Sequence, residues 1–314
     1  MIFIYYDIVN TIKSFPLLHT MKIIPLLKKI LTAILLLTIS VSLLSLVLEK
    51  HIFYAHLFVH FQLQYFLIIF VCSLLLLVLK KYIFAIIGLL YIITFYFFFF
   101  HKMSLFSTLP ETTDILFLNS QYDSSRMDLT LNLIEQLKPT TISLVESNPN
   151  LIKKIIPLKN EPALNHRAYA SSCTVFSELP TNEQKILGKN HLPICIVSFA
   201  NFDLITVHPH RPMNPAILQE NLQFFDELST VIQKYETNKR KFIVVGDFNS
   251  TYYSSYFRER FGRYDQKIIS TWMAGTPLSL PIDHVLTNMN VQVERSPQVG
   301  SDHRALLIDI LEEF

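Results

Sequence analysis

The chain of 314 residues carries a formal net charge of +2, and its composition changes sharply near residue 102. Up to Lys102 it is rich in Leu, Ile, Phe and Val and has eight lysines against two acidic residues, a net charge of +6. From Met103 onward 19 basic residues face 23 acidic ones, a net charge of −4, which argues against a tight, non-specific nucleic-acid binder but does not exclude a nuclease.

The apolar part contains three stretches, at about residues 30–48, 60–79 and 82–100. A helix needs roughly 20 apolar residues to cross a bilayer, and the second stretch reaches this length only with its polar start included. Helices buried in a soluble core are the alternative, but such helices keep a polar stripe, and residues 82–100 contain no charged residue. We therefore predict a membrane anchor over residues 1–102, which contacts a lipid bilayer through three transmembrane helices.

Lysines flanking these stretches predict the orientation. Six fall on one side (Lys13, Lys22, Lys28, Lys29, Lys80 and Lys81) and two on the other (Lys50 and Lys102). Basic residues favour the cytoplasmic side, so the N-terminus is expected there and residues 103–314 outside the cytoplasm. The late apolar run, followed by further spans, is unlike a cleavable signal peptide. Since Met21 also resembles a natural start, it stays open whether residues 1–20 belong to the natural protein.

From residue 114 the pattern changes to alternating strands and helices. Strands are predicted at residues 115–118, 141–145, 173–176, 194–199, 204–207, 242–245, 282–286 and 305–310, and a helix at 125–137. A second helix starts with Asn214 as its N-cap and Pro215 at its first position. Its predicted apolar face comprises Ile217, Leu218, Leu222, Phe225, Val231 and Ile232. This alternation predicts an α/β domain with a layered sheet core.

The three cysteines add little to the interpretation. Cys72 lies in an apolar stretch and is expected to act as a small apolar residue. Cys173 and Cys195 lie in two separate predicted strands of the exported domain, where a disulfide is chemically permitted. Two free buried thiols are the favoured interpretation over a disulfide.

Polar residues collect at the ends of the predicted strands. They are Asn119, Glu146, His208, Asp247, Asn249, Asp283, Asp302 and His303. Each alone has an ordinary explanation, such as a turn residue or a surface histidine. Together they suit a hard divalent cation and a phosphate group, since Mg²⁺ prefers a few carboxylate oxygens and retained waters. Zinc is less favoured because the set contains no cysteine pair.

The motifs around these residues resemble those of the endonuclease/exonuclease/phosphatase superfamily. They are Asn119, Leu144-Val145-Glu146, Val207-His208-Pro209, Gly246-Asp247-Phe248-Asn249, Ile282-Asp283-His284 and Ser301-Asp302-His303. Six motifs in the family's order, over about residues 115–310, make the resemblance specific. It implies a four-layered α/β sandwich of DNase-like type. With the anchor in front, the chain looks like a bacterial inner-membrane subgroup, its catalytic domain periplasmic.

The resemblance also implies roles for these residues. Glu146 would be the chief ligand of Mg²⁺, or alternatively Mn²⁺, with Asn119 and Asp302 close to the ion. Asp247 would activate water and Asn249 would hold a phosphate oxygen. His208 and His303 would contact the phosphate, and Asp283 would orient His303. Val145 replaces a glutamine common in relatives, and a phosphate-contacting tyrosine has no secure counterpart, which argues against DNA repair.

The sequence thus predicts a membrane-anchored, metal-dependent phosphoric ester hydrolase acting on a phosphodiester or phosphomonoester outside the cytoplasm. A lipid-linked or small phosphorylated substrate is favoured by the acidic domain and the anchor, and nucleic acid stays open as a substrate of an exported nuclease. A catalytically silent binding or scaffold module is the alternative from another class. A transporter is disfavoured because the spans carry no intramembrane charge.

Overall fold

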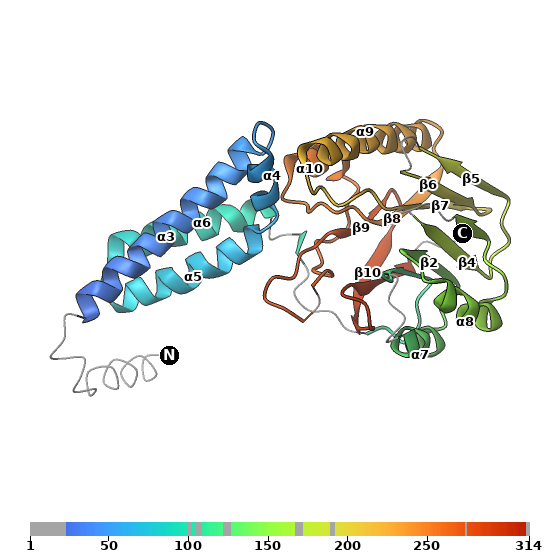
Figure 1. Ribbon diagram of the computed structural model, residues 1–314, viewed down its shortest axis with the longest axis horizontal. Helices are drawn as coiled ribbons and strands as arrows, with labels where there is room; N and C mark the ends of the chain where they lie inside the picture. Colours follow the sequence, from blue (N-terminus) through green and yellow to red (C-terminus); the bar gives the residue numbers. More distant parts are fainter. Residues whose placement is uncertain are drawn as a thin grey trace. The chain divides into compact units, whose positions relative to one another are not determined.

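The computed structural model describes residues 23–99, 102–103, 109–121, 127–166, 172–188, 192–273 and 275–311. These residues form two compact units (Figure 1). Unit 1 comprises residues 23–47 and 61–99, and unit 2 comprises residues 48–60 and the described residues from Lys102 onward. The division differs from the predicted boundary at residue 102, because the connection Leu48–His60 belongs to the unit that carries the strands. The question about residues 1–20 falls outside the described residues.

Unit 1 is a bundle of three apolar helices, α3 (Ile23–Leu48), α5 (Gln62–Val78) and α6 (Tyr82–Phe99). By length and composition α3 and α6 are candidate membrane spans, and α5 joins them only when counted with α4 (Phe53–Val59), from which it is bent by 65°. The predicted third transmembrane helix therefore has weaker support than the other two. The first helix begins at Ile23 rather than near residue 30, and position 100 lies outside the described residues.

Polar side chains join the three helices of unit 1. The hydroxyl of Ser42 on α3 donates to Oε1 of Gln62 on α5 at 2.5 Å and lies 2.5 Å from the hydroxyl of Tyr91 on α6. Gln62 Nε2 also donates to Ser45 Oγ at 3.0 Å. In a bundle with apolar surfaces, such hydrogen bonds between helices add to van der Waals packing.

Unit 2 contains two sheets. The first has the strand order β10-β11-β1-β2-β4-β3, and the second has the order β5-β6-β7-β8-β9. The first sheet is built from β1 (Ile115–Asn119), β2 (Thr141–Val145), β3 (Leu164–His166), β4 (Cys173–Ser177), β10 (Val291–Gln298) and β11 (Arg304–Ile310). The second is built from β5 (Glu183–Leu187), β6 (Ile194–Ser198), β7 (Phe202–Val207), β8 (Lys241–Asp247) and β9 (Asp283–Thr287). Strands β1 and β2 are parallel, as are β7 and β8, and the other pairs are antiparallel.

The two sheets pack face to face, with helices on both outer faces (Figure 1). Between them lies a buried core that includes Phe117 and Val175 of the first sheet and Val197 and Val245 of the second. Helices α7 (Met127–Leu137) and α8 (Pro149–Lys159) cover the outer face of the first sheet through a second apolar cluster. Helices α9 (Pro215–Thr237) and α10 (Ser255–Phe261) lie on the other side. The result is the four-layered α/β arrangement.

Several predicted elements needed correction. Strand β8 does not stop at Gly246 but continues to Asp247, and a Cβ at Gly246 would lie 2.3 Å from the Val207 carbonyl oxygen, so only glycine fits there. The buried residues of α9 are Asn221, Phe224, Phe225, Leu228 and Ile232, of which only the third and last were predicted. Sequence reasoning missed α8, α10, β3, β5 and β10. In β5 every residue is exposed, so no apolar run marked it.

The prediction of two free thiols in the sheets was wrong. Cys173 on β4 and Cys195 on β6 form a disulfide, with Cα atoms 6.7 Å apart. The two strands belong to different sheets, so the bond crosses the core between them. Cys72 is a free, buried cysteine of α5, as predicted.

Candidate active site

The eight predicted site residues gather at one edge of the two sheets. Asn119 ends β1, Glu146 follows β2, His208 follows β7, Asp247 ends β8 with Asn249 two residues on, Asp283 begins β9, and Asp302 and His303 precede β11. Parallel strands end at the same edge of a sheet, and an antiparallel neighbour begins there. Asp247 and Asp283 are therefore direct partners in register. The edges of both sheets meet, since Asn119 Nδ2 donates to Asp247 Oδ2 at 2.9 Å.

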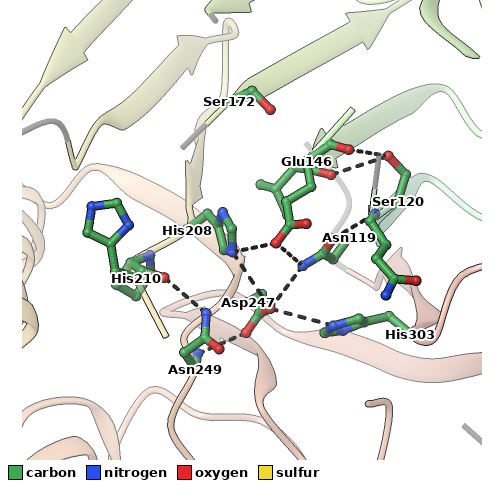
Figure 2. A network of polar contacts seen from close by, with 12 residues as sticks. Asn119, Ser120, Glu146, Ser172, His208, His210, Asp247, Asn249 and His303 are labelled. Atoms are coloured by element: carbon green, nitrogen blue, oxygen red, sulfur yellow. Dashed lines mark hydrogen bonds and ion pairs between the residues drawn. The ribbon is translucent and has the colours of Figure 1, made fainter. Parts of the chain in front are cut away.

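Asp247 is the centre of the network (Figure 2). Besides Asn119, its Oδ2 has His303 Nε2 at 3.6 Å and His208 Nε2 at 3.8 Å, while its Oδ1 accepts the backbone N–H of Asn249 at 2.8 Å. The residue is only 2% exposed. Burial and the charge of Asp283 raise the pKa of the Asp247 carboxyl above its ordinary value. A carboxylate with a raised pKa is a better general base near neutral pH.

Glu146 lies beside this centre and is more open to solvent. Its Oε1 accepts from Asn119 Nδ2 at 3.2 Å and lies 3.2 Å from His208 Nε2. Burial raises the pKa of Glu146, but the hydrogen bond and charge of His208 more than offset this, so the pKa lies below its ordinary value. Burial lowers the pKa of the His208 imidazole. The hydrogen bond to Glu146 and the charge of Asp247 outweigh this effect, so the pKa lies above its ordinary value. The lowered pKa of the carboxyl and the raised pKa of the imidazole both favour the ion-paired form of these two groups.

His303 is held by Asp283. Nδ1 of the imidazole donates to Asp283 Oδ2 at 2.8 Å, which leaves Nε2 facing Asp247. Burial alone would lower the pKa of His303, but the charge of Asp283 and the hydrogen bond to it raise the pKa to about 9. The imidazole is consequently a cation near neutral pH, suited to contact a phosphate oxygen or to donate a proton.

Two site residues have left-handed backbone conformations. Glu146 has φ of 49° and Asn249 has φ of 48°. Asparagine visits this region readily, whereas glutamate does so rarely. Strained backbone of this kind concentrates at functional sites, where surrounding contacts enforce it. At Glu146 the enforcing contact is a hydrogen bond from the Ser120 hydroxyl to its carbonyl oxygen at 2.9 Å.

Asp302 lies at the margin of the site. Its Oδ2 accepts from the indole Nε1–H of Trp272 at 2.9 Å, and its Oδ1 is 3.9 Å from His303 Nε2. The guanidinium of Arg211 lies over the Trp272 ring at 5.4 Å. Sequence reasoning missed Trp272. It is the only tryptophan of the chain and comes shortly before the Asp283 motif, and these two facts could have drawn attention to it. The carbonyl oxygen of His210 accepts from Asn221 Nδ2.

The oxygen donors of this edge fit a hard divalent cation. Among the described residues, Oε1 of Glu146 carries its hydrogen bonds and Oε2 makes none. Glu146 and Asp302 are the more exposed acids, with side chains 24% and 34% accessible, as an ion that keeps several waters requires. Asn119 points its amide nitrogen at the carboxylates, so it fits a hydrogen-bonding role better than that of a ligand.

A second acidic group lies deeper. Asp247, Asp283 and His303 offer ligand atoms within 4.8 Å of one another, and no other such group occurs in the described part of the chain. Their closeness is explained by the hydrogen bond between His303 and Asp283, which already uses the imidazole Nδ1. We therefore interpret this trio as an acid–base group and not as the ion's main site.

Known proteins resemble this chain in sequence pattern and in fold. The sequence model of the Endonuclease/Exonuclease/phosphatase family matches residues 115–303. An AP endonuclease from Archaeoglobus fulgidus is 12% identical, with 63% of this chain and 99% of that one covered and a TM-score of 0.52. The 3′ phosphatase NExo from Neisseria, solved with a product DNA hairpin, is 12% identical, with 63% and 99% covered and a TM-score of 0.50.

A third similar structure is truncated TDP2 from Caenorhabditis elegans, which is 12% identical, with 62% and 96% covered and a TM-score of 0.48. No curated protein sequence matches the chain. At these identities the solved structures inform on the fold alone.

Proposed function

Because the chain belongs to the endonuclease/exonuclease/phosphatase family, whose members are phosphoric ester hydrolases, we propose that the edge of unit 2 described above hydrolyses a phosphate ester. The observation that carries the proposal is Asp247, a buried carboxylate shared by Asn119 and Asn249 and faced by His303. A silent scaffold module has no use for a buried acid surrounded by oriented polar groups, since burying such groups costs stability.

The proposed reaction uses each group for one task. Asp247, whose pKa is raised, takes the proton of the attacking water. His303, oriented through its other nitrogen by Asp283, stabilises charge on the phosphate or protonates the leaving oxygen. His208 and Asn249 are proposed as phosphate contacts. The orientation of the Asn249 side chain is fixed by a hydrogen bond that its Nδ2 donates to the Pro209 carbonyl oxygen at 3.0 Å.

Mg²⁺ is the proposed cofactor, with Mn²⁺ as the alternative. Glu146 and Asp302 would hold it, with Asn119 orienting Glu146. When bound, such an ion neutralises charge on the phosphate oxygens. Removal of the ion by EDTA is expected to abolish hydrolysis, and added Mg²⁺ to restore it.

We further propose that unit 1 anchors the protein in a membrane with three crossings. Leu48–His60 and the strands share one unit, so in a membrane-anchored protein with this unit on one side, the chain would cross an even number of times between His60 and Lys102. If α6 crosses, α5 must cross too. The lysine asymmetry then favours unit 2 outside the cytoplasm, and the Cys173–Cys195 disulfide supports an oxidising compartment.

The orientation is tested with two fusions. A reporter that works only after export should be active after Phe314 and silent after Lys81, which lies on the opposite side in this arrangement. Activity of a cytoplasm-only reporter after Phe314 would overturn the proposed side.

For the substrate, we favour a lipid-linked or small phosphoester, because the part from Met103 onward has a net charge of −4 and the anchor keeps it at a bilayer. Nucleic acid is the second candidate. It is favoured by the similar fold of a 3′ phosphatase solved with a DNA hairpin.

The deciding experiment is a substrate panel on the full chain in detergent with Mg²⁺. The panel contains phospholipid vesicles, small phosphodiesters and monoesters, single-stranded DNA and plasmid DNA. We expect turnover of a lipid or small ester that is lost with EDTA and with Asp247→Asn. Turnover of DNA alone would reverse the substrate order, and a folded protein inactive on every ester would favour the scaffold module.

A further inference from the structure

A segment from between the apolar helices contacts the loop that carries the catalytic groups. Leu48–His60 belongs to unit 2, and its last residue, His60, is buried there. His60 Nδ1 lies 2.9 Å from the Thr251 hydroxyl and 3.3 Å from the Thr251 backbone nitrogen. A backbone N–H can only donate, so Nδ1 is the acceptor. Thr251 comes two residues after Asn249 and four after Asp247.

Each of the last two residues of the loop from Asp247 to Thr251 is fixed by a hydrogen bond with a histidine. His284 Nε2 donates to the Ser250 carbonyl oxygen at 2.9 Å, and Asp265 fixes the other nitrogen of His284 at 3.1 Å. His60 holds the next residue, Thr251, which is fully buried. One support comes from β9, close in space along the sheet, and the other from a segment 191 positions away in sequence.

The same segment also caps the helix that follows this loop. Ser254 is the N-cap of α10, but its side chain makes no capping bond. Instead the Ser255 backbone N–H donates to Glu49 Oε1 at 2.6 Å, and Glu49 is 2% exposed. A buried carboxylate at a helix N-terminus satisfies an otherwise unpaired donor and interacts favourably with the helix dipole. Residues 251–255 are thus fixed at two points by Leu48–His60.

A metal site is the competing explanation for this segment, because His56 and His60 are four residues apart, a spacing seen in metal ligands. Glu49 Oε2 lies 4.0 Å from His56 Nδ1. Glu49, His56 and His60 nevertheless do not bring three ligand atoms within 4.8 Å of one another, which in the described part of the chain only the Asp247 group does. Both hydrogen-bond contacts of the His60 Nδ1 end on Thr251 of the loop, so positioning explains them better.

We propose that Leu48–His60 is a positioning element of the catalytic loop, with His60 as its positioning residue. The proposal rests on the proposed function for the meaning of Asp247 and Asn249. Small displacements of reacting groups cost rate heavily, so a loop without this support should catalyse poorly while substrate binding by other groups is retained. A fragment that starts at residue 103 would lack the element.

The test compares His60→Leu with His60→Asn in the full chain. Asparagine offers an acceptor oxygen near the position of Nδ1, whereas leucine offers none. We expect His60→Leu to lower kcat roughly 10- to 100-fold with little change in KM, and His60→Asn to recover most of the loss. His51→Leu, an exposed histidine of the same segment, is the matched control and should behave as the parent.

Hydrogen exchange supplies a readout that does not depend on activity. In His60→Leu, amides of residues 248–255 should exchange about fivefold faster, the effect of losing one net hydrogen bond, while amides of β2 and β7 stay unchanged. If His60→Leu does not fold, Glu49→Met and Thr251→Val replace it; the first removes the acceptor of the Ser255 N–H, and the second removes the hydroxyl that contacts His60. Parent-like kcat together with unchanged exchange at 248–255 would overturn the proposal. Inactivity of the parent with faster exchange in the variant would instead count against the proposed function alone.

Discussion

Asp247 shows how a single residue can be both structural and reactive. It accepts hydrogen bonds from Asn119 on one oxygen and from the Asn249 backbone on the other, so both carboxylate oxygens help to hold the site together, and each keeps a lone pair for the reaction. The side chains of Asp247 and His303 are both buried. Substitution here therefore affects stability as well as rate.

Replacing Asp247 with asparagine should lower kcat by about 10²- to 10⁴-fold, because the amide cannot take a proton from water. The NH₂ group of the new asparagine would also face a donor, either Asn119 Nδ2 or the Asn249 backbone N–H, and that hydrogen bond would be lost. This loss should lower the unfolding free energy by about 1–3 kcal/mol. Turnover per folded molecule and a melting curve measure the two effects separately. Near-parental turnover by the folded variant would contradict the mechanism.

His303→Ala tests whether the two residues act on one transition state. The substitution removes the cation next to Asp247 and leaves the buried Asp283 without its partner. We expect a loss of about 10²- to 10³-fold alone. Combined with Asp247→Asn, the loss should be smaller than the product of the single effects, because groups that serve one step are not additive. Strict multiplicativity would argue that they act in separate steps.

Among the secondary-structure elements, α9 is held at its start by a cap that the sequence predicts. Asn214 Oδ1 accepts from the Ile217 backbone N–H at 3.0 Å, with Pro215 at the first helical position. Asn214→Ala should lower the unfolding free energy by about 1 kcal/mol and leave kcat unchanged. Chemical denaturation and steady-state kinetics check this. A drop in kcat without loss of stability would place Asn214 in the site.

Helices α5 and α6 approach closely at Gly88. A Cβ there would lie 1.9 Å from Ser73 Oγ and 3.1 Å from Leu35 Cδ1. Small residues permit such close packing of apolar helices. Gly88→Leu should therefore destabilise the full chain in detergent by about 1–3 kcal/mol, as overpacking does. Leu90→Ile, at an exposed position of the same helix, is the control. Equal melting of the two variants would contradict this packing.

For the molecule as a whole, the Cys173–Cys195 disulfide is a covalent link between the two sheets. It closes a loop with a sequence separation of 22, which in the chain-entropy account stabilises the fold by about 3 kcal/mol. The double variant Cys173→Ser with Cys195→Ser should lose about that much unfolding free energy. Thiol labelling of the denatured, unreduced protein should modify Cys72 alone. Labelling of all three cysteines would show that Cys173 and Cys195 are free thiols.

The sequence by itself determined the features that depend on local pattern. Apolar runs marked the helices α3 and α6, short apolar runs marked β1 and β2, and Asn214-Pro215 marked the start of α9. The site residues could also be predicted, because polar residues directly before or after a buried strand lie at a sheet edge, whatever the order of the strands. All eight predicted residues lie at that edge.

Only the tertiary structure decided what depends on distant segments meeting. Nothing near Cys173 indicates that β4 faces β6 of the other sheet, and nothing near His60 indicates that a segment between apolar helices contacts Thr251. Strand β5, exposed throughout, owes its form to pairing with β6 and not to its own apolar pattern. The physical reason is that periodicity records which face of an element is buried, whereas the identity of the partner that buries it is set by packing of the whole chain.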